Sequence, residues 1–182
     1  AAFSMQDVLL EPYGGQVLGL SVGATTALTA LLALGSLAGF AVAARALGRG
    51  ANPCRIAGFG ALAGVVAFSA VIFAAPVGSA LLFRVGTVLI GFGGGLFSVG
   101  TLTAAMGLAV RCIGHGFKVG IVQFVKGAWN TGERDVLARF PELCVMKAMG
   151  EGFTWDTQDR KRDIAAAAQA WATAKAMMAD SA

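Results

Sequence analysis

Two carboxylates and one isolated arginine are the side chains in the apolar first part of the sequence that could bind a ligand. Asp7 and Glu11 are spaced i and i+4, so they share one helix face or flank a turn. There they could ligate a magnesium ion through water or anchor a partner subunit, and the alternative is an acidic loop in solvent. Arg84 stands alone in an apolar stretch and either extends to a membrane interface or is a buried functional charge.

The glycine run and the cysteines predict no catalytic, nucleotide-binding or metal-binding residue. Gly93-Gly94-Gly95 fits neither G-x-G-x-x-G nor G-x-x-x-x-G-K-[ST], and it lies within an apolar span. Helix packing is therefore favoured over phosphate binding. Cys54, Cys112 and Cys144 are far apart, without a C-x-x-C pair and with one histidine in the chain, which argues against a disulfide framework or a zinc site.

The composition separates the chain into two physical classes. Of the 182 residues, 57% are hydrophobic and 13% are charged, with mean hydropathy +0.72, which excludes a disordered chain or an ordinary soluble enzyme and favours a membrane protein. Residues 1–106 carry six charged side chains, whereas residues 107–182 carry eighteen. We therefore expect two segments, 1–106 and 107–182, to meet near Met106. The net charge of +4 is modest, and no nucleic-acid partner is predicted.

The first segment is expected to cross the lipid bilayer about three times. Its 33 consecutive uncharged residues from Pro12 to Ala44 exceed the roughly 20 that one helical span requires. We predict spans at about 18–44, 56–73 and 82–106, all helical because lipid cannot satisfy open backbone groups. Small residues one turn apart let such helices approach closely. The G-x-x-x-G pairs are Gly19/Gly23, Gly35/Gly39, Gly60/Gly64 and Gly91/Gly95.

The arginines predict the orientation of this segment. Arg45, Arg49 and Arg55 crowd the loop between the first two spans, and the positive-inside rule places that loop in the cytoplasm. Arg84 would then lie near the outer end of the third span. Residues 107–182 would follow that span into the cytoplasm.

The first segment resembles a family of bacterial membrane proteins. The string is Met5-Gln-Asp-Val-Leu-Leu-Glu-Pro-Tyr-Gly-Gly15, followed by Leu18-Gly-Leu-Ser21 and a Thr-, Leu- and Gly-rich span. Over about residues 1–106 it resembles the PucC-type family, major-facilitator-like proteins of phototrophic bacteria linked to bacteriochlorophyll delivery and light-harvesting complex assembly. The resemblance implies an internal piece, around helices seven to nine, of a twelve-helix bundle.

The resemblance also implies ligands and a location. Asp7, Glu11 and Arg84 become candidate contacts to bacteriochlorophyll or to light-harvesting subunits and other membrane helices. The location would be the bacterial inner membrane, cytoplasmic or intracytoplasmic. The usual facilitator loop signature is degenerate, because Ala44 rather than Asp precedes Arg45, which argues against a transport cycle.

The second segment is predicted to be an α/β fragment. Gly107–Ile113 suggests a short helix ended by glycines, and 118–125 is an apolar, β-rich run typical of a buried parallel strand. Residues 142–149 suggest a second strand. A helix is expected from Thr157 to about Met178, capped by Thr154 or Asp156. Its apolar positions at helical spacing are Ile164, Ala168, Trp171 and Met178.

These residues resemble a second, unrelated family. The motifs are Gly107-Leu-Ala-x-Arg111, Gly114-His-Gly116, Lys118-Val119, Val122-Gln-Phe-x-Lys-Gly127, Gly132-Glu133 and Gly150-Glu-Gly-Phe-Thr-Trp155. Over 103–182 they resemble corrinoid (cob(I)yrinic acid a,c-diamide) adenosyltransferase, a P-loop-NTPase-like enzyme of cobalamin biosynthesis that uses ATP and Mg. By that resemblance Phe153 and Trp155 wall the corrinoid, and the alternative is ordinary packing.

The same resemblance predicts an incomplete enzyme. No Gly-Lys-Ser or Gly-Lys-Thr occurs in this chain, and Phe97–Leu102 stands where the P-loop is expected. The later strand whose acidic end would assist Mg is likewise not expected before Ala182. We therefore expect no ATP chemistry by this polypeptide alone.

Three functional hypotheses remain open. The first is a membrane structural or assembly protein related to bacteriochlorophyll delivery. The second is a membrane-tethered adenosyltransferase fragment, inactive without a P-loop, and the third is a non-functional fusion. The string Thr103-Ala-Ala-Met106 suits both families, so a crossover within it would create this chain.

Overall fold

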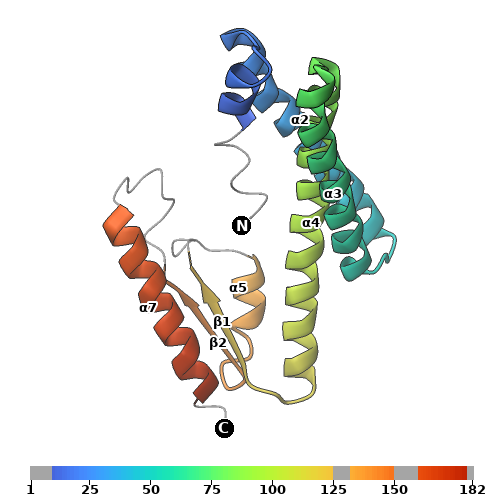
Figure 1. Ribbon diagram of the computed structural model, residues 1–182. Helices are drawn as coiled ribbons and strands as arrows, with labels where there is room; N and C mark the ends of the chain where they lie inside the picture. Colours follow the sequence, from blue (N-terminus) through green and yellow to red (C-terminus); the bar gives the residue numbers. More distant parts are fainter. Residues whose placement is uncertain (1–9, 125–131, 150–159, 180–182) are drawn as a thin grey trace. The chain divides into compact units, whose positions relative to one another are not determined.

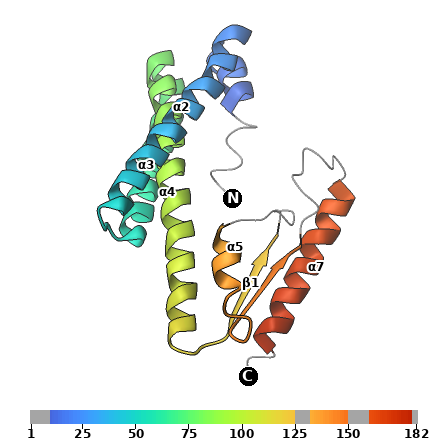
Figure 2. The same ribbon diagram turned by 180° about the vertical axis from the view of Figure 1, so that it is seen from behind.

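The chain folds as two compact units. The computed structural model describes residues 10–124, 132–149 and 160–179, and the chain divides into Ala1–Met106 and Gly107–Ala182. The first unit contains three long helices, and the second contains a pair of strands with two helices (Figures 1 and 2).

Three helices of the first unit are long and apolar enough to cross a membrane. They are α2 (Val22–Gly48), α3 (Pro53–Val77) and α4 (Ala80–Gly114), counted among the described residues. The predicted spans 56–73 and 82–106 lie within α3 and α4, and the predicted span 18–44 begins four residues before α2. Helices α2 and α3 run farther than predicted toward the loop that connects them. This is a membrane segment by helix length and composition.

Polar and special residues fix where the helices begin and end. The Ser21 side chain accepts a hydrogen bond from the backbone N–H of Ala24, and the Asn52 side chain accepts one from that of Cys54 at 2.9 Å. Pro53 occupies the first position of α3, where its missing N–H costs nothing. Gly78 ends α3 in the left-handed conformation (φ 63°), which glycine adopts without strain.

Glycines bring the backbones of α2 and α4 into contact. A Cβ added at Gly35 would lie 2.2 Å from the carbonyl oxygen of Val88, and one added at Gly91 would lie 2.2 Å from that of Leu32. Gly39 meets the Phe92 carbonyl oxygen in the same way, at 2.4 Å. Because residue numbers rise together along both helices at these contacts, α2 and α4 run parallel. No larger side chain fits at these positions.

A different set of glycines joins α4 to α3. Cβ atoms added at Gly93 and Gly100 would lie 2.8 Å from the Gly60 carbonyl oxygen and 2.6 Å from the Ala57 nitrogen. Gly86 packs against Val71. Gly86, Gly93 and Gly100 are seven residues apart, which is two helical turns, so they share one face of α4. The glycine run therefore serves helix packing, with Gly93 toward α3 and Gly95 toward Ser36 of α2.

One predicted glycine pair takes no part in this packing. Gly19 precedes α2 with φ 63°, and a Cβ added at Gly19 or Gly23 would meet nothing within 4 Å. The prediction for Gly19/Gly23 as a packing pair was wrong, because Gly19 forms the turn that leads into α2. Spacing alone does not distinguish a turn glycine from a packing glycine.

Helix α4 continues past Met106 into the second unit. Residues 107–113, expected as a separate short helix, form its last turns, and the helix ends at Gly114. Gly116 then takes φ 80°. Nothing between Met106 and Gly107 interrupts the helical hydrogen bonds, so the two segments are joined within one helix.

The second unit has a parallel strand pair. β1 (Val119–Gln123) pairs with β2 (Cys144–Ala148) from Val119↔Cys144 to Gln123↔Ala148. Helix α5 (Gly132–Leu137) lies in the crossover that a parallel pair requires, and it contacts β2. Both strands lie where strands were predicted, and β1 pairs in parallel, as expected for a run of its type. β1 is half-buried rather than buried, because the described sheet has two strands.

Helix α7 (Arg160–Ala179) packs on β1 through a face other than the predicted one. Ala170 is fully buried, and Met177 lies against Gly120, whereas Ile164 and Trp171 are more than half exposed. The expected apolar stripe therefore faces outward. The face of α7 toward β1 therefore includes Ala170 and Met177. The predicted caps of this helix lie outside the described residues.

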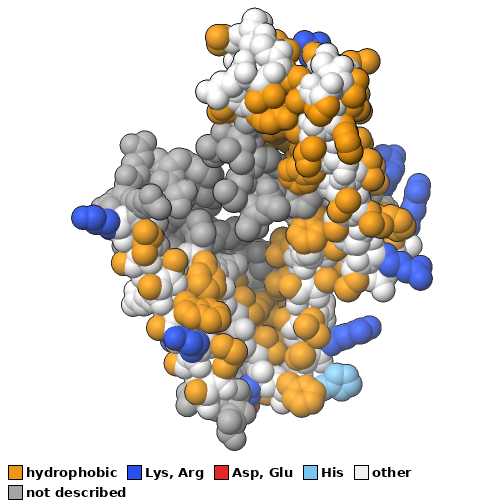
Figure 3. Space-filling view, in the orientation of Figure 1, with side chains coloured by type: hydrophobic (Ala, Val, Ile, Leu, Met, Phe, Trp, Pro, Cys, Tyr) orange, Lys and Arg blue, Asp and Glu red, His pale blue; other side chains and the backbone are white. Residues whose placement is uncertain are grey.

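Apolar side chains cover much of the visible helix surface (Figure 3). Apolar side chains of the three spans that are more than half exposed include Leu34, Phe59, Ile72 and Leu81. An exposed apolar surface on long helices is typical of a protein that faces lipid or further membrane helices.

Candidate functional site

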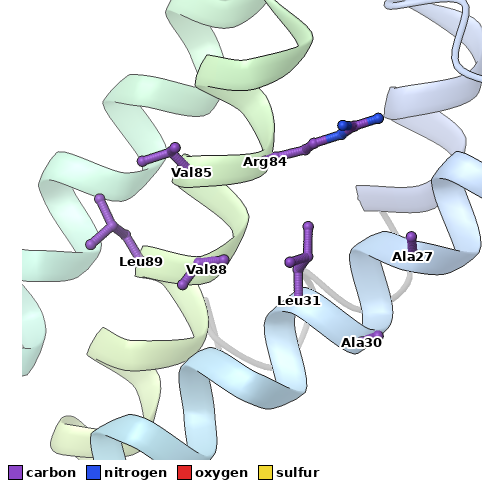
Figure 4. A pocket seen from close by; sticks show the side chains of 7 residues that line it. All are labelled: Ala27, Ala30, Leu31, Arg84, Val85, Val88 and Leu89. Atoms are coloured by element: carbon purple, nitrogen blue, oxygen red, sulfur yellow. The ribbon is translucent and has the colours of Figure 1, made fainter.

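An apolar groove lies between α2 and α4 in the first unit. It has a volume of about 630 Å³. Its walls are the side chains of Ala27, Ala30, Leu31, Val85, Val88 and Leu89, and Arg84 stands at its edge. The Arg84 side chain extends away from α4, and Leu31 of α2 lies below it in the view of Figure 4. The groove can therefore offer hydrocarbon contacts and one positive charge.

Arg84 is exposed and has no carboxylate partner within the described ranges. It is the fifth residue of α4, and Ser79 caps that helix by accepting a hydrogen bond from the backbone N–H of Leu82 at 3.2 Å. Both predicted alternatives for Arg84, a side chain that extends to a membrane interface and a buried functional charge, stay predictions.

Glu11 makes a short hydrogen bond to the first long helix. The Thr29 hydroxyl donates to Glu11 Oε1 at 2.6 Å, which is in the range of charge-assisted O–H···O bonds. Both residues line a small cavity of about 40 Å³, which is large enough for one water molecule. Asp7, the predicted neighbour of Glu11, lies outside the described residues.

The short helix over residues 10–16 is held against α2 and α4. Leu10 is buried, and the Tyr13 ring stacks on Phe83 with 5.7 Å between centroids. Gly14 meets Leu28 and Phe83, where a Cβ would come within 3.1 to 3.3 Å. These contacts fix the position of Glu11. Sequence reasoning missed Thr29, because α2 carries several hydroxyl side chains and only the contact with Glu11 distinguishes this one.

The described residues of the second unit do not include the two that were predicted to contact a corrinoid. Phe153 and Trp155, the predicted corrinoid contacts, lie outside them. Cys144 is buried at the start of β2, and this burial raises the pKa of its thiol. Within residues 10–124, 132–149 and 160–179, no three His, Cys, Asp or Glu side chains gather to hold a metal ion.

Fold and site define a helical membrane segment continued by an α/β unit, and both parts have known relatives. The PUCC protein family matches residues 1–129, and the ATP:corrinoid adenosyltransferase BtuR/CobO/CobP family matches residues 85–182. The chain therefore belongs to the PucC family through its first part and to the corrinoid adenosyltransferase family through its second. Residues 85–129 are matched by both families.

Individual relatives agree with the two family matches. An uncharacterised protein of the puhA-bchM intergenic region of Rhodobacter capsulatus is 51% identical over 132 residues, which is 72% of this chain and 26% of that protein. Protein PucC of Rhodovulum sulfidophilum is 50% identical over 128 residues, 70% of this chain and 26% of the relative.

A relative of the second part comes from Pseudomonas aeruginosa. Its corrinoid adenosyltransferase is 54% identical over 81 residues, which is 44% of this chain and 40% of that enzyme. The chain thus spans about a quarter of its PucC relatives and two fifths of this adenosyltransferase.

Proposed function

We propose that this chain is a membrane protein of bacteriochlorophyll delivery and light-harvesting complex assembly. The observation that carries the proposal is the glycine-packed, parallel pair α2 and α4 in the part that matches the PucC family. Close packing of this kind makes a rigid membrane element that can present side chains to a partner. The surrounding fold would be a major-facilitator-like bundle, and the location would be the bacterial inner membrane.

Glu11 and its neighbours are the proposed pigment or partner contacts. The carboxylate of Glu11, held by Thr29, can accept a hydrogen bond from a water molecule on a pigment magnesium. Asp7 and Arg84 are proposed as further contacts to bacteriochlorophyll or to light-harvesting subunits. This assignment makes Glu11 a binding residue and involves no catalysis by the membrane segment.

Pigment content tests the proposal. The full chain, expressed in a phototrophic bacterium and extracted in mild detergent, should co-purify with bacteriochlorophyll or with light-harvesting subunits. Glu11→Gln should reduce that amount, whereas Arg49→Gln, at the other end of α2, should not. A chain that is present in the membrane but carries neither pigment nor subunits would exclude the proposal.

A second function is favoured by the parallel pair β1 and β2 and by the family match over residues 85–182. We propose that residues 107–182 are an adenosyltransferase fragment in the cytoplasm that retains corrinoid contacts at Phe153 and Trp155. Because the chain carries no Gly-Lys-Ser or Gly-Lys-Thr, we expect no adenosyl transfer from ATP by this polypeptide alone.

Ligand titration separates the two functions. Calorimetry of the purified full chain with cobinamide and with ATP and Mg should show corrinoid binding without ATP binding. Phe153→Ala with Trp155→Ala should remove the corrinoid signal. No binding of either ligand would exclude the second function and leave the first untouched.

The join itself is tested by one peptide. Trypsin cleavage after Arg84 and Arg111 releases Val85–Arg111, which crosses Met106. Its detection by mass spectrometry in native membranes would establish the fusion as a real protein. Detection of the two parent sequences alone would make the question of a function for the whole chain moot.

A further inference from the structure

The groove between α2 and α4 has the shape of a wedge that closes at a glycine contact. Val88 lines the groove. A Cβ added at Gly35 would lie 2.2 Å from the carbonyl oxygen of Val88. The helices therefore touch at the base of the groove and separate toward Ala27 and Arg84. A linear hydrocarbon chain can lie along such a wedge.

The charge at the open end of the groove is unbalanced. Arg84 is the cation on a wall that is otherwise apolar, and it has no acidic partner in the part of the chain that the structure describes. The carboxylate of Glu11 accepts a hydrogen bond from Thr29. The positive end of the α4 dipole adds to the attraction for an anion. The groove therefore suits a ligand with an apolar chain and an anionic head.

The position of Arg84 along α4 matches the edge of a bilayer. From Arg84 to Met106 the helix rises about 33 Å at 1.5 Å per residue, close to the roughly 30 Å of a hydrocarbon core. The groove from Arg84 to Leu89 covers about 8 Å of that depth. A lipid whose headgroup contacts Arg84 would thus place in the groove the acyl-chain carbons nearest to that headgroup.

We propose that this groove binds one anionic phospholipid, with the phosphate on the Arg84 guanidinium and one acyl chain between Ala30 and Val88. The arginines at the opposite ends of α2 and α3 place this site in the outer leaflet by the positive-inside rule. The inference requires a bilayer around the first unit and does not rest on pigment handling. It gives Arg84 a lipid partner of defined chemistry.

Native mass spectrometry of the full chain with phosphatidylglycerol and with phosphatidylcholine of the same acyl chains tests the proposal. The chain should retain one phosphatidylglycerol with a preference of about fivefold, the size expected for one basic residue near an anionic lipid. Arg84→Gln should abolish that preference, Arg84→Lys should keep most of it, and Arg49→Gln should leave it unchanged.

A second variant tests the groove independently of the charge. Ala30→Leu fills the wedge and should weaken retention of both lipids, while an unchanged melting temperature reports intact folding. Equal retention of the two lipids by the unaltered chain, or full retention of phosphatidylglycerol by Arg84→Gln, would overturn the proposal. So would occupation of the groove by bacteriochlorophyll, seen as pigment that Ala30→Leu removes.

Discussion

The two units pack their elements in opposite ways. In the first unit, backbone touches backbone: Gly35 meets Val88 and Gly60 meets Phe97, with no side chain between them. In the second unit, side chains separate the elements, since Met177 of α7 fills the space over Gly120 of β1. The difference follows from the solvent. Lipid provides no hydrophobic drive between helices, so close van der Waals contact must hold them together, whereas the second unit gains by burying apolar area from water.

The largest expected effect is at the α2–α4 contact. Gly35→Leu places a side chain into the Val88 backbone, which cannot move aside without separating the helices. We expect loss of the folded first unit, measured as aggregation in detergent by size-exclusion chromatography. Gly23→Leu, on the same helix but with nothing within 4 Å, should elute like the unaltered chain. Equal behaviour of the two variants would show that the glycine contact does not hold the helices.

The next effect is confined to the second unit. Leu137 is 2% exposed, so Leu137→Ala should destabilise this unit by about 2 to 3 kcal/mol through lost burial and a cavity. Val136→Ala, at a neighbour that is 49% exposed, should cost well under 1 kcal/mol. Hydrogen exchange should locate the loss in residues 107–182. Faster exchange in α2 would contradict the independence of the two units.

Alanine substitutions at Gly60 and Gly120 compare the tolerance of the two units for an added Cβ. Gly60→Ala puts a Cβ 2.5 Å from the Phe97 nitrogen and should cost about 1 to 3 kcal/mol, while Gly58→Ala, with nothing within 4 Å, should not destabilise. Gly120→Ala meets the flexible Met177 side chain at 3.0 Å, which can shift, so its cost should stay below about 1 kcal/mol. Thermal unfolding of each variant measures these differences, and a larger cost at Gly120 would reverse the comparison.

The smallest effect is chemical and leaves the fold intact. Burial raises the pKa of the Cys144 thiol, so less thiolate is present near neutral pH, whereas Cys54 is exposed. Maleimide should label Cys54 well before Cys144 at pH 7, and labelling of Cys144 should accelerate as the pH rises toward its pKa. Mass spectrometry of tryptic peptides measures both rates. Equal rates at pH 7 would show that Cys144 is reached by solvent.

The elements were largely predictable because each has a local signal. Apolar runs of sufficient length marked α2, α3 and α4, and β-rich runs marked β1 and β2. The site was predictable only in part. Glu11 and Arg84 stood out as charges in an apolar segment, but Thr29 and the groove depend on which faces of α2 and α4 meet, and that depends on tertiary contacts.

Two errors show where local patterns are insufficient. Gly19 and Gly23 have the spacing of a packing pair, yet only a partner helix at that point would make them one, and Gly19 forms a turn instead. On α7 the large residues Ile164 and Trp171 suggested the buried face, but the sheet takes the alanine face, with Ala170 fully buried. In both cases the position of the neighbouring element decides, and the spacing of residues along one helix gives no information about that position.

The sequence by itself determined the two physical classes and their two families, because hydropathy, charge density and motifs are properties of the chain. The tertiary structure alone decided that α4 runs unbroken through the boundary between the units and that its glycines serve two helices at once. Gly91 and Gly95 face α2, while Gly93 faces α3, because successive residues of a helix point in different directions. Which face of α4 contacts which neighbouring helix depends on how the helices pack.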